Sequence, residues 1–333
     1  RKMSAPATCR VESTVSTEPG DSWWDHAEWA WWHSLMLKVL KLNGPLPRHV
    51  AFVMDGNRRY ARCNQMGSVL RGHECGFKQL TKILEWCSRF GVVEVTVYAF
   101  SIENFKRSPE EVNGLMELAE QKFALLLEDR ERLEEKQIRF RFLGNTSLLS
   151  PKLRLLVAKI ELETSHFENG TVNVCMPYSS TDEMARAVEA IRQGRQLGLI
   201  QEKQISEWLI SRCLDTADSS DPDLLIRTSG ERRLSDFLLW QANKTHLYFD
   251  PVLWPDFSFS NLCRAVHSYQ YNYISVQKMA ASVSPPEPAE EEKAALQPFL
   301  SWHRDNRVKL LEEYSKWKES EEEDTVDSNT RIE

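Results

Sequence analysis

The chain carries an unusual group of polar residues at the end of an apolar run near its start. The run VAFVM occupies residues 50–54, and a short apolar run closed by a turn signal predicts a buried strand that leads into a loop. The residues that follow it are Asp55, Gly56, Asn57, Arg58 and Arg59. A carboxylate is a hard oxygen ligand for Mg²⁺, and guanidinium groups bind phosphate oxygens bidentately. A charged surface turn is the alternative interpretation of this stretch alone.

Two further predicted strand ends carry polar groups of the same kinds. In residues 98–111 (YAFSIENFKRSPEE), an apolar run ends at Phe100 and is followed by Ser101, Glu103, Asn104, Phe105 and Arg107. Residues 223–241 (DLLIRTSGERRLSDFLLWQ) contain Arg227, Ser229, Arg232, Arg233 and Ser235. One such loop could be a basic surface loop paired with Glu231 and Asp236. Three strand ends with arginines and small polar residues predict two anionic groups bound side by side.

The elements that must position these residues alternate between strand and helix. Apolar runs predict strands at residues 93–100, 138–143, 172–178, 224–226 and 245–249. Apolar residues at helical spacing predict helices within 77–87 and 110–136 and at 151–167, 182–193, 203–213, 258–280 and 298–318. This alternation predicts an α/β fold, a single domain over residues 44–282 with a mostly parallel central sheet flanked by helices.

The segments outside that domain differ in composition. Residues 1–21 are polar and are predicted to be disordered. Residues 22–43 are rich in tryptophan and predict an amphipathic helix that lies on a membrane or closes the mouth of an apolar tunnel; packing on the domain or on a partner is the open alternative. Residues 283–333 read as a Pro- and Glu-rich linker, a helix and an acidic tail.

Composition excludes several classes of protein. The 333 residues have a net charge of -7, with acidic residues crowded near the C-terminal end, which argues against a general nucleic-acid binder. Seven cysteines without a CxxC pair predict a reducing compartment and no structural zinc. No window has the ~18 apolar residues of a membrane span, and no secretory signal is visible. The P-loop, GxGxxG, HExxH, GxSxG and DDxxD motifs are also absent.

Five motifs in this order resemble the cis-prenyltransferase (undecaprenyl diphosphate synthase) family, and its eukaryotic dehydrodolichyl diphosphate synthase branch most of all. They are DGNRRYA, GHECG, VTVYAFSIENFKRSPEEV, DLLIRTSGERRLSDFLLWQ and FDPVLWPDF. The resemblance covers roughly residues 44–280. It implies an enzyme that adds isopentenyl diphosphate in cis to farnesyl diphosphate with Mg²⁺, making a long polyprenyl diphosphate, the dolichol precursor used in protein glycosylation.

The resemblance also implies roles for individual residues. Asp55 would hold Mg²⁺ on the allylic diphosphate, and the loop that grips this diphosphate would be Gly56, Asn57, Arg58 and Arg59. Asn104 and His73 would orient the substrates and assist proton loss. The residues implied for isopentenyl diphosphate and its support are Ser101, Phe105, Arg107, Glu111, Arg227, Arg233 and Ser235. The long helix around 110–136 would line a tunnel for the growing chain.

The chain departs from the family pattern at four places. Val69 replaces a basic residue, Thr181 stands where an arginine is expected, and His246 replaces a metal-binding glutamate of bacterial members. Because Mg²⁺ prefers oxygen ligands, we do not expect His246 to bind it. The sequence ends in Arg331, Ile332 and Glu333 instead of Arg-x-Gly, so we expect a non-catalytic subunit resembling the Nogo-B receptor to supply that tail.

The resemblance further implies a peripheral location on the cytosolic face of the endoplasmic reticulum membrane. Two other classes remain as alternatives. A non-catalytic interaction subunit on the same fold is favoured by the changes at Val69 and Thr181, but it has no need of intact DGNRR, FSIENFKR and RTSGERR motifs. A sugar-nucleotide or dinucleotide enzyme needs a Gly-rich strand–helix turn that the sequence lacks.

Overall fold

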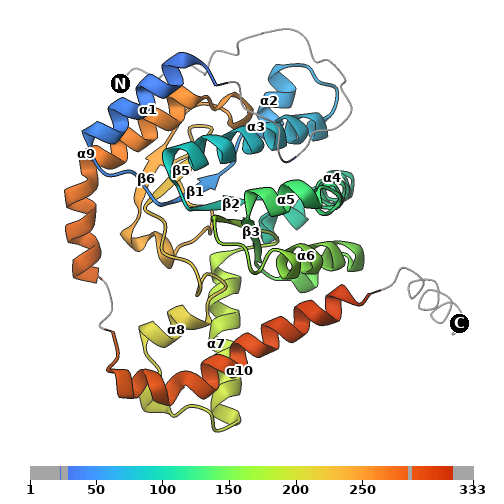
Figure 1. Ribbon diagram of the computed structural model, residues 1–333. Coiled ribbons are helices and arrows are strands. Elements are labelled where there is room, and N and C mark those ends of the chain that lie inside the picture. Colours follow the sequence, from blue (N-terminus) through green and yellow to red (C-terminus); the bar gives the residue numbers. More distant parts are fainter. Residues whose placement is uncertain (1–22, 24–28, 284–286, 318–333) are drawn as a thin grey trace, which may run out of the picture.

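The computed structural model describes residues 23, 29–283 and 287–317. A six-stranded sheet forms its centre, in the order β3-β4-β2-β1-β5-β6, and all five neighbouring pairs are parallel (Figure 1). The strands are β1 (His49–Val53), β2 (Glu94–Tyr98), β3 (Ile138–Leu143), β4 (Gly170–Cys175), β5 (Leu224–Arg227) and β6 (His246–Phe249). The predicted fold class, an α/β fold with a mostly parallel sheet, is confirmed.

Helices cover both faces of this sheet (Figure 1). They are α1 (Trp31–Asn43), α2 (Asn57–Cys63), α3 (Val69–Phe90), α4 (Pro109–Glu128), α5 (Arg130–Lys136), α6 (Pro151–Glu163), α7 (Ser180–Gln196), α8 (Glu207–Cys213), α9 (Phe259–Val283) and α10 (Glu290–Ser315). Along β1, Val50 and Phe52 pack into one core, while Ala51 and Val53 pack into the core on the other face. Strands buried on both faces are rich in apolar residues, which is why these runs could be found in the sequence.

The predicted helix over residues 110–136 is two helices in the structure. Ser108 caps α4, with its side chain accepting a hydrogen bond from the Glu111 backbone N–H, and Pro109 occupies the first turn, as the sequence predicts. The helix ends at Glu128, and Asp129 separates it from α5. Only α4 therefore forms the long wall beside the sheet.

The C-terminal helix α10 starts earlier than the sequence predicts. It begins at Glu290 and continues through Pro298, so part of the expected linker over 283–293 is helical. Acidic residues are favourable in the first turn of a helix, and this turn contains three glutamates. The helix packs along α6 and α8 (Figure 1), and its Phe299 is fully buried. The predicted acidic tail lies outside the described residues.

The N-terminal helix α1 is shorter than the predicted helix over 22–43, since it begins at Trp31. It lies against α9 (Figure 1), which matches the alternative that it packs on the domain. Several large apolar side chains of α1 nevertheless face solvent, including Trp31 and Leu42, which are 79% and 88% exposed. Residues 1–22 and 24–28, with the predicted disordered segment, are outside the described part. In the part of the chain that is described, no helix is long and apolar enough to cross a bilayer.

Candidate active site

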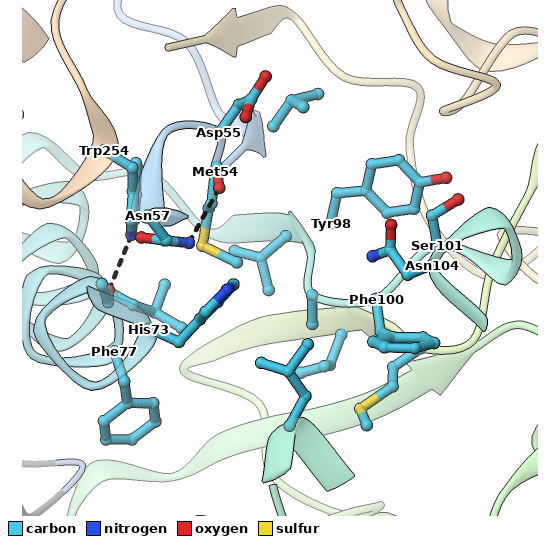
Figure 2. A pocket seen from close by; sticks show the side chains of 18 of the residues that line it. Met54, Asp55, Asn57, His73, Phe77, Tyr98, Phe100, Ser101, Asn104 and Trp254 are labelled. Atoms are coloured by element: carbon cyan, nitrogen blue, oxygen red, sulfur yellow. Dashed lines mark hydrogen bonds between the residues drawn. The ribbon is translucent and has the colours of Figure 1, made fainter. Parts of the chain in front are cut away.

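Three adjacent strands bring their carboxyl ends to one edge of the sheet. β1 pairs with β2 on one side and with β5 on the other, so the loops that carry Asp55, Ser101 and Arg227 meet there. A cavity of about 670 Å³ opens at this edge. Figure 2 shows Asp55 and His73 on one side of the cavity, with Ser101 and Asn104 across from them. The meeting of the strand ends expected from the sequence is therefore found.

Asp55 is held by one arginine from the helix that follows it, α2, and by another from a neighbouring strand, β5. Its Oδ2 accepts a hydrogen bond of 3.0 Å from Nη2 of Arg227 and lies 3.8 Å from Nη2 of Arg59. Burial opposes ionisation of this carboxyl, but the hydrogen bond and charge of Arg227, a hydrogen bond from Ser229 and the charge of Arg59 together outweigh it, so the pKa of Asp55 is below its ordinary value. The side chain is therefore a carboxylate at neutral pH.

Arg227 connects two of the three loops. Its side chain is 3% exposed, and Nη1 donates to the Ser235 hydroxyl over 2.7 Å and to the Arg233 carbonyl oxygen. The Arg233 side chain is mostly exposed and pairs with Glu231. One buried and one exposed guanidinium thus line the same cavity, which is an arrangement that can bind an anionic group.

Glycines allow close packing around the loop after β1, against the segment after β6 and against α3. Gly56 has φ +114°, and a Cβ there would lie 2.9 Å from Leu253. A Cβ on Gly76 would lie 2.3 Å from Oδ1 of Asn57, and one on Gly72 would lie 2.3 Å from the Asn57 carbonyl oxygen. The glycines of the GHECG motif therefore permit contact between α2 and α3. They also bring His73, which lies between them, to the cavity.

His73 is a neutral imidazole inside the cavity wall. Burial, followed by the charges of Arg107 and Arg58, lowers its pKa to about 4. Its Nε2 is buried and has no hydrogen-bond partner among the described residues. An unpartnered nitrogen beside a cavity can bind a polar group of a ligand, or a water molecule.

A chain of hydrogen bonds fixes the loop after β2. Arg107 donates from Nη2 to Oδ1 of Asn104 over 2.7 Å and from Nη1 to Glu111 over 2.8 Å. Glu111 also lies 3.7 Å from Nη1 of Arg58. Because Arg107 occupies the amide oxygen of Asn104, the NH₂ group of this side chain is the part left to bind a ligand.

The deeper part of the cavity is apolar. Its lining there includes Phe77, Leu115, Ala119 and Phe123 from α3 and α4, with Trp23 among them. Trp23 is 5% exposed and donates from Nε1 to the Lys122 carbonyl oxygen over 2.7 Å. The cavity therefore joins an ionic rim to an apolar interior, and it suits a long molecule with one charged end.

Comparison with known proteins identifies the family. The family model of undecaprenyl diphosphate synthase matches residues 53–275. The chain belongs to this family, the cis-prenyltransferases. Its curated relatives include the dehydrodolichyl diphosphate synthase complex subunit of Homo sapiens, 46% identical over 77% of each chain, and the isoprenyl transferase of Thermus thermophilus, 40% identical over 73% of this chain and 92% of that one.

Solved structures give the same result. The lavandulyl diphosphate synthase of Lavandula x intermedia, crystallised with dimethylallyl diphosphate, is 31% identical, with a TM-score of 0.63 over 68% of this chain and 95% of that one. A structure from Campylobacter jejuni titled a probable undecaprenyl diphosphate synthase has a TM-score of 0.56 at 28% identity, over 68% of this chain and 95% of that one. The fold and the family together identify this cis-prenyltransferase as a polyprenyl diphosphate synthase.

The structure places most of the predicted site residues at the cavity of this cis-prenyltransferase. Those that line it are Asp55, Asn57, Arg58, His73, Ser101, Asn104, Arg107, Arg227, Arg233 and Ser235. Four predicted residues support the cavity without lining it. Gly56 forms the turn, and Arg59 bonds Ser229. Phe105 packs on Phe100 with ring centroids 4.9 Å apart, and Glu111 holds its two arginines.

Two acidic residues that the sequence analysis did not assign to a site, Glu103 and Asp236, also line the cavity. Glu103 pairs with Lys106, and Asp236 was considered only as a partner for basic groups. The position of Asp236 follows directly after Ser235, so its proximity to a predicted binding residue was the one available signal. His246 lies at the start of β6, where it pairs with Leu224 at the start of β5, and it bonds Ser268. Arg227 is at the other end of β5, so His246 lies at the opposite edge of the sheet from the cavity rim.

The side chains at the cavity can be compared with what binding of Mg²⁺, the metal that the family implies, requires. Among the described residues, no three His, Cys, Asp or Glu side chains form a group that could hold a metal ion by themselves. Mg²⁺ is commonly bound by one or two carboxylates together with substrate phosphates. Asp55 at the rim of the cavity fits that arrangement, in which the ion comes with a diphosphate.

Proposed function

We propose that this enzyme condenses isopentenyl diphosphate in cis onto farnesyl diphosphate, with Mg²⁺, to give a long-chain polyprenyl diphosphate that serves as the dolichol precursor in protein glycosylation. The observation that supports this most is the contact of Asp55, Arg227 and Ser235 at the rim of a cavity with an apolar interior. Two diphosphates at the rim and a hydrocarbon chain inside would use both parts of this cavity.

The allylic diphosphate would be bound by the loop after β1. Asp55 would hold Mg²⁺, with Gly56, Asn57, Arg58 and Arg59 around the same diphosphate. When bound, the ion would supply positive charge to the leaving diphosphate. Arg58 adds charge at the cavity, and Arg59 keeps the carboxylate of Asp55 in place. Arg58, together with the ion when it is bound, would stabilise the negative charge that develops as the carbon–oxygen bond breaks.

Isopentenyl diphosphate would be bound by Arg227, Arg233 and Ser235. The loop after β2 would support it through Ser101, Phe105, Arg107 and Glu111, and Asn104 would donate from its NH₂ group. His73 is neutral and its Nε2 is free of partners among the described residues, so it can bind an ordered group or accept a proton. The double bond would attack the allylic carbon as the bond from that carbon to its diphosphate oxygen breaks, and the adduct would then give a proton to a basic group at the rim, where oxygens of the released diphosphate are available.

The apolar interior would hold the growing chain and exclude water. An allylic cation that meets water is quenched, so the wall formed by α3, α4 and the sheet protects the reaction as well as binding the product. Leu115 and Phe123 both line the cavity. Each can therefore pack in the core and also contact the hydrocarbon chain of the product.

The enzyme would work as part of a complex at a membrane. Its human, mouse and fission yeast relatives are named as subunits of a dehydrodolichyl diphosphate synthase complex. We infer a non-catalytic subunit similar to the Nogo-B receptor that supplies an Arg-x-Gly tail. The exposed apolar face of α1, with Trp31 and Leu42, supports peripheral binding to the cytosolic face of the endoplasmic reticulum.

Replacement of Asp55 tests the proposed reaction. Incorporation of radiolabelled isopentenyl diphosphate into butanol-soluble product should require farnesyl diphosphate and Mg²⁺, and Asp55→Ala should lower it by about a thousandfold or more. The assay is run with and without the second subunit. Wild-type turnover by Asp55→Ala would disprove the metal assignment. Lack of activity in the wild-type complex would instead favour a non-catalytic subunit on the same fold.

A further inference from the structure

The loop that carries Ser235 has an uncommon backbone conformation. Ser235, Asp236 and Leu238 have φ values of +54°, +58° and +48°, in the left-handed region that side-chain-bearing residues rarely adopt. Such a conformation persists only where surrounding contacts hold it, and it is found often at ligand sites. The contacts that hold residues 235–239, here called the serine loop, therefore determine where Ser235 lies.

The first turn of α7 supplies one set of these contacts. The Ser180 backbone N–H donates to the Asp236 carbonyl oxygen over 2.8 Å. Thr181 donates to Oδ1 of Asp236 from both its backbone N–H and its hydroxyl, each over 3.1 Å. In return, the Leu239 backbone N–H donates to the Ser180 hydroxyl over 2.8 Å. Two residues of α7 thus bond both ends of the serine loop.

Tyr98 of β2 also contacts the serine loop. The Tyr98 hydroxyl donates to the Ser235 carbonyl oxygen over 3.3 Å. Phe237 is fully buried and stacks on the Tyr98 ring, with ring centroids 4.4 Å apart. These contacts fix the backbone, whereas among the described residues it is Thr181 that bonds the Asp236 side chain and so sets its direction.

The direction of the Asp236 carboxylate matters because this residue lines the cavity beside Arg227, Arg233 and Ser235. A carboxylate that turns toward a bound diphosphate repels it, and it also competes for the same guanidinium groups. Two hydrogen bonds from Thr181 hold the carboxylate at the N-terminus of α7 instead. The positive end of the helix dipole attracts it to the same place.

We propose that Thr181 is a positioning residue for isopentenyl diphosphate, acting through Asp236 on the serine loop. Thr181 is exposed, and it occupies the position at which the resemblance to the family led us to expect an arginine. Its hydroxyl keeps Ser235 beside Arg227 and keeps the Asp236 carboxylate away from the substrate. This inference rests on the proposed function, in which Arg227, Arg233 and Ser235 bind the diphosphate of isopentenyl diphosphate.

The test compares Thr181→Ala with Thr181→Ser in the full chain. Binding of isopentenyl diphosphate, measured by calorimetry without the allylic substrate, should weaken about fivefold in Thr181→Ala, the size of effect expected for the loss of one ordinary hydrogen bond. The serine variant should stay within about twofold of wild type. In the active complex, the KM for isopentenyl diphosphate should rise, while that for farnesyl diphosphate should not.

A helix-cap variant far from the cavity is the matched control. Ser206 caps α8 by accepting a hydrogen bond of 3.3 Å from the Leu209 backbone N–H, and Ser206→Ala should lower Tm without changing either KM. Thr181→Ala added to Asp236→Ala should cause no further loss of binding, because the partner of the hydroxyl is already gone.

Three outcomes separate the explanations. Unchanged binding in Thr181→Ala, together with weak binding in Ser235→Ala, would overturn the role of Thr181 and leave the proposed function standing. Unchanged binding in Ser235→Ala and Arg227→Gln would overturn the proposed function itself. Equal losses in Thr181→Ala and Thr181→Ser would show that the hydroxyl is not responsible, which also overturns the inference.

Discussion

Arg227 donates a hydrogen bond of 3.0 Å to Asp55 from the strand beside β1. The same guanidinium bonds Ser235 through its other terminal nitrogen. One buried cation is therefore shared between the acid proposed to hold Mg²⁺ and the loop proposed to hold isopentenyl diphosphate. Removal of this cation should affect both halves of the site, and its effect on Asp55 can be measured separately through pH.

Arg227→Gln should shift the acidic limb of the pH profile upward. Burial raises the pKa of Asp55, while Arg227, Ser229 and Arg59 together bring it below its ordinary value, so loss of the Arg227 guanidinium should raise this pKa. In the wild type, the ionised Asp55 contributes stability above its unfolded pKa of ~3.9 that is lost as pH falls through the lower folded pKa. The check is kcat/KM against pH. Arg233→Gln should lower activity without moving the limb.

The convergence of the strand ends could be predicted from sequence because parallel strands present their carboxyl ends at one edge of a sheet. Contacts between distant segments could not be predicted. Thr181 was interpreted as the loss of an arginine, since its partner Asp236 is 55 residues away. The start of α10 was missed because Pro and Glu residues are typical of linkers, yet three glutamates also suit a first helical turn.

His73 should remain neutral throughout the working pH range. Burial and the charges of Arg107 and Arg58 lower its pKa to about 4, so its imidazole NMR signals should not titrate between pH 5.5 and 8. Because the folded pKa is below the unfolded value of ~6.5, its neutral form adds stability that falls away as pH drops from about 6.5 toward 4. Arg107→Gln should raise this pKa. Titration near 6.5 in the wild type would contradict the burial of the ring.

Glu111→Gln should uncouple the two loops that it joins. Its carboxylate contacts Arg107 at 2.8 Å and Arg58 at 3.7 Å, and Arg107 in turn holds Asn104. Loss of the charge should reduce kcat/KM on the order of tenfold, the effect of weakening a hydrogen bond to a charged group. Glu110→Gln, at an exposed neighbouring position in the same first turn of α4, is the control and should retain wild-type kinetics.

Arg307→Ala should loosen α10 from the body of the enzyme. Its Nη2 donates to the Phe142 carbonyl oxygen over 2.9 Å and lies 2.8 Å from Oε1 of Glu161. The partly buried side chain should contribute about 1–3 kcal/mol to stability, measured by urea unfolding. Arg304→Ala, an exposed position of the same helix, should have little effect. Equal stability of both variants would show that α10 is held by its apolar contacts alone.

Trp23→Ala should both destabilise the enzyme and lengthen its products. Trp23 packs edge-on against Phe77 and Phe140, with ring centroids 4.9 and 5.4 Å away, and stacks on Phe123 at 6.2 Å. Truncation of a buried tryptophan costs about 3–5 kcal/mol. Because Trp23 lines the apolar part of the cavity, its removal also opens space for the hydrocarbon chain.

Thin-layer chromatography of the dephosphorylated products tests this second effect. The main product should shift to longer chains in Trp23→Ala, because the cavity wall at that place is gone. Trp31→Ala, on the exposed face of α1, keeps the wall intact and should leave product length unchanged. A lower Tm with the wild-type product range in Trp23→Ala would mean that the tryptophan only fills the core, and that the growing chain leaves the cavity by another route.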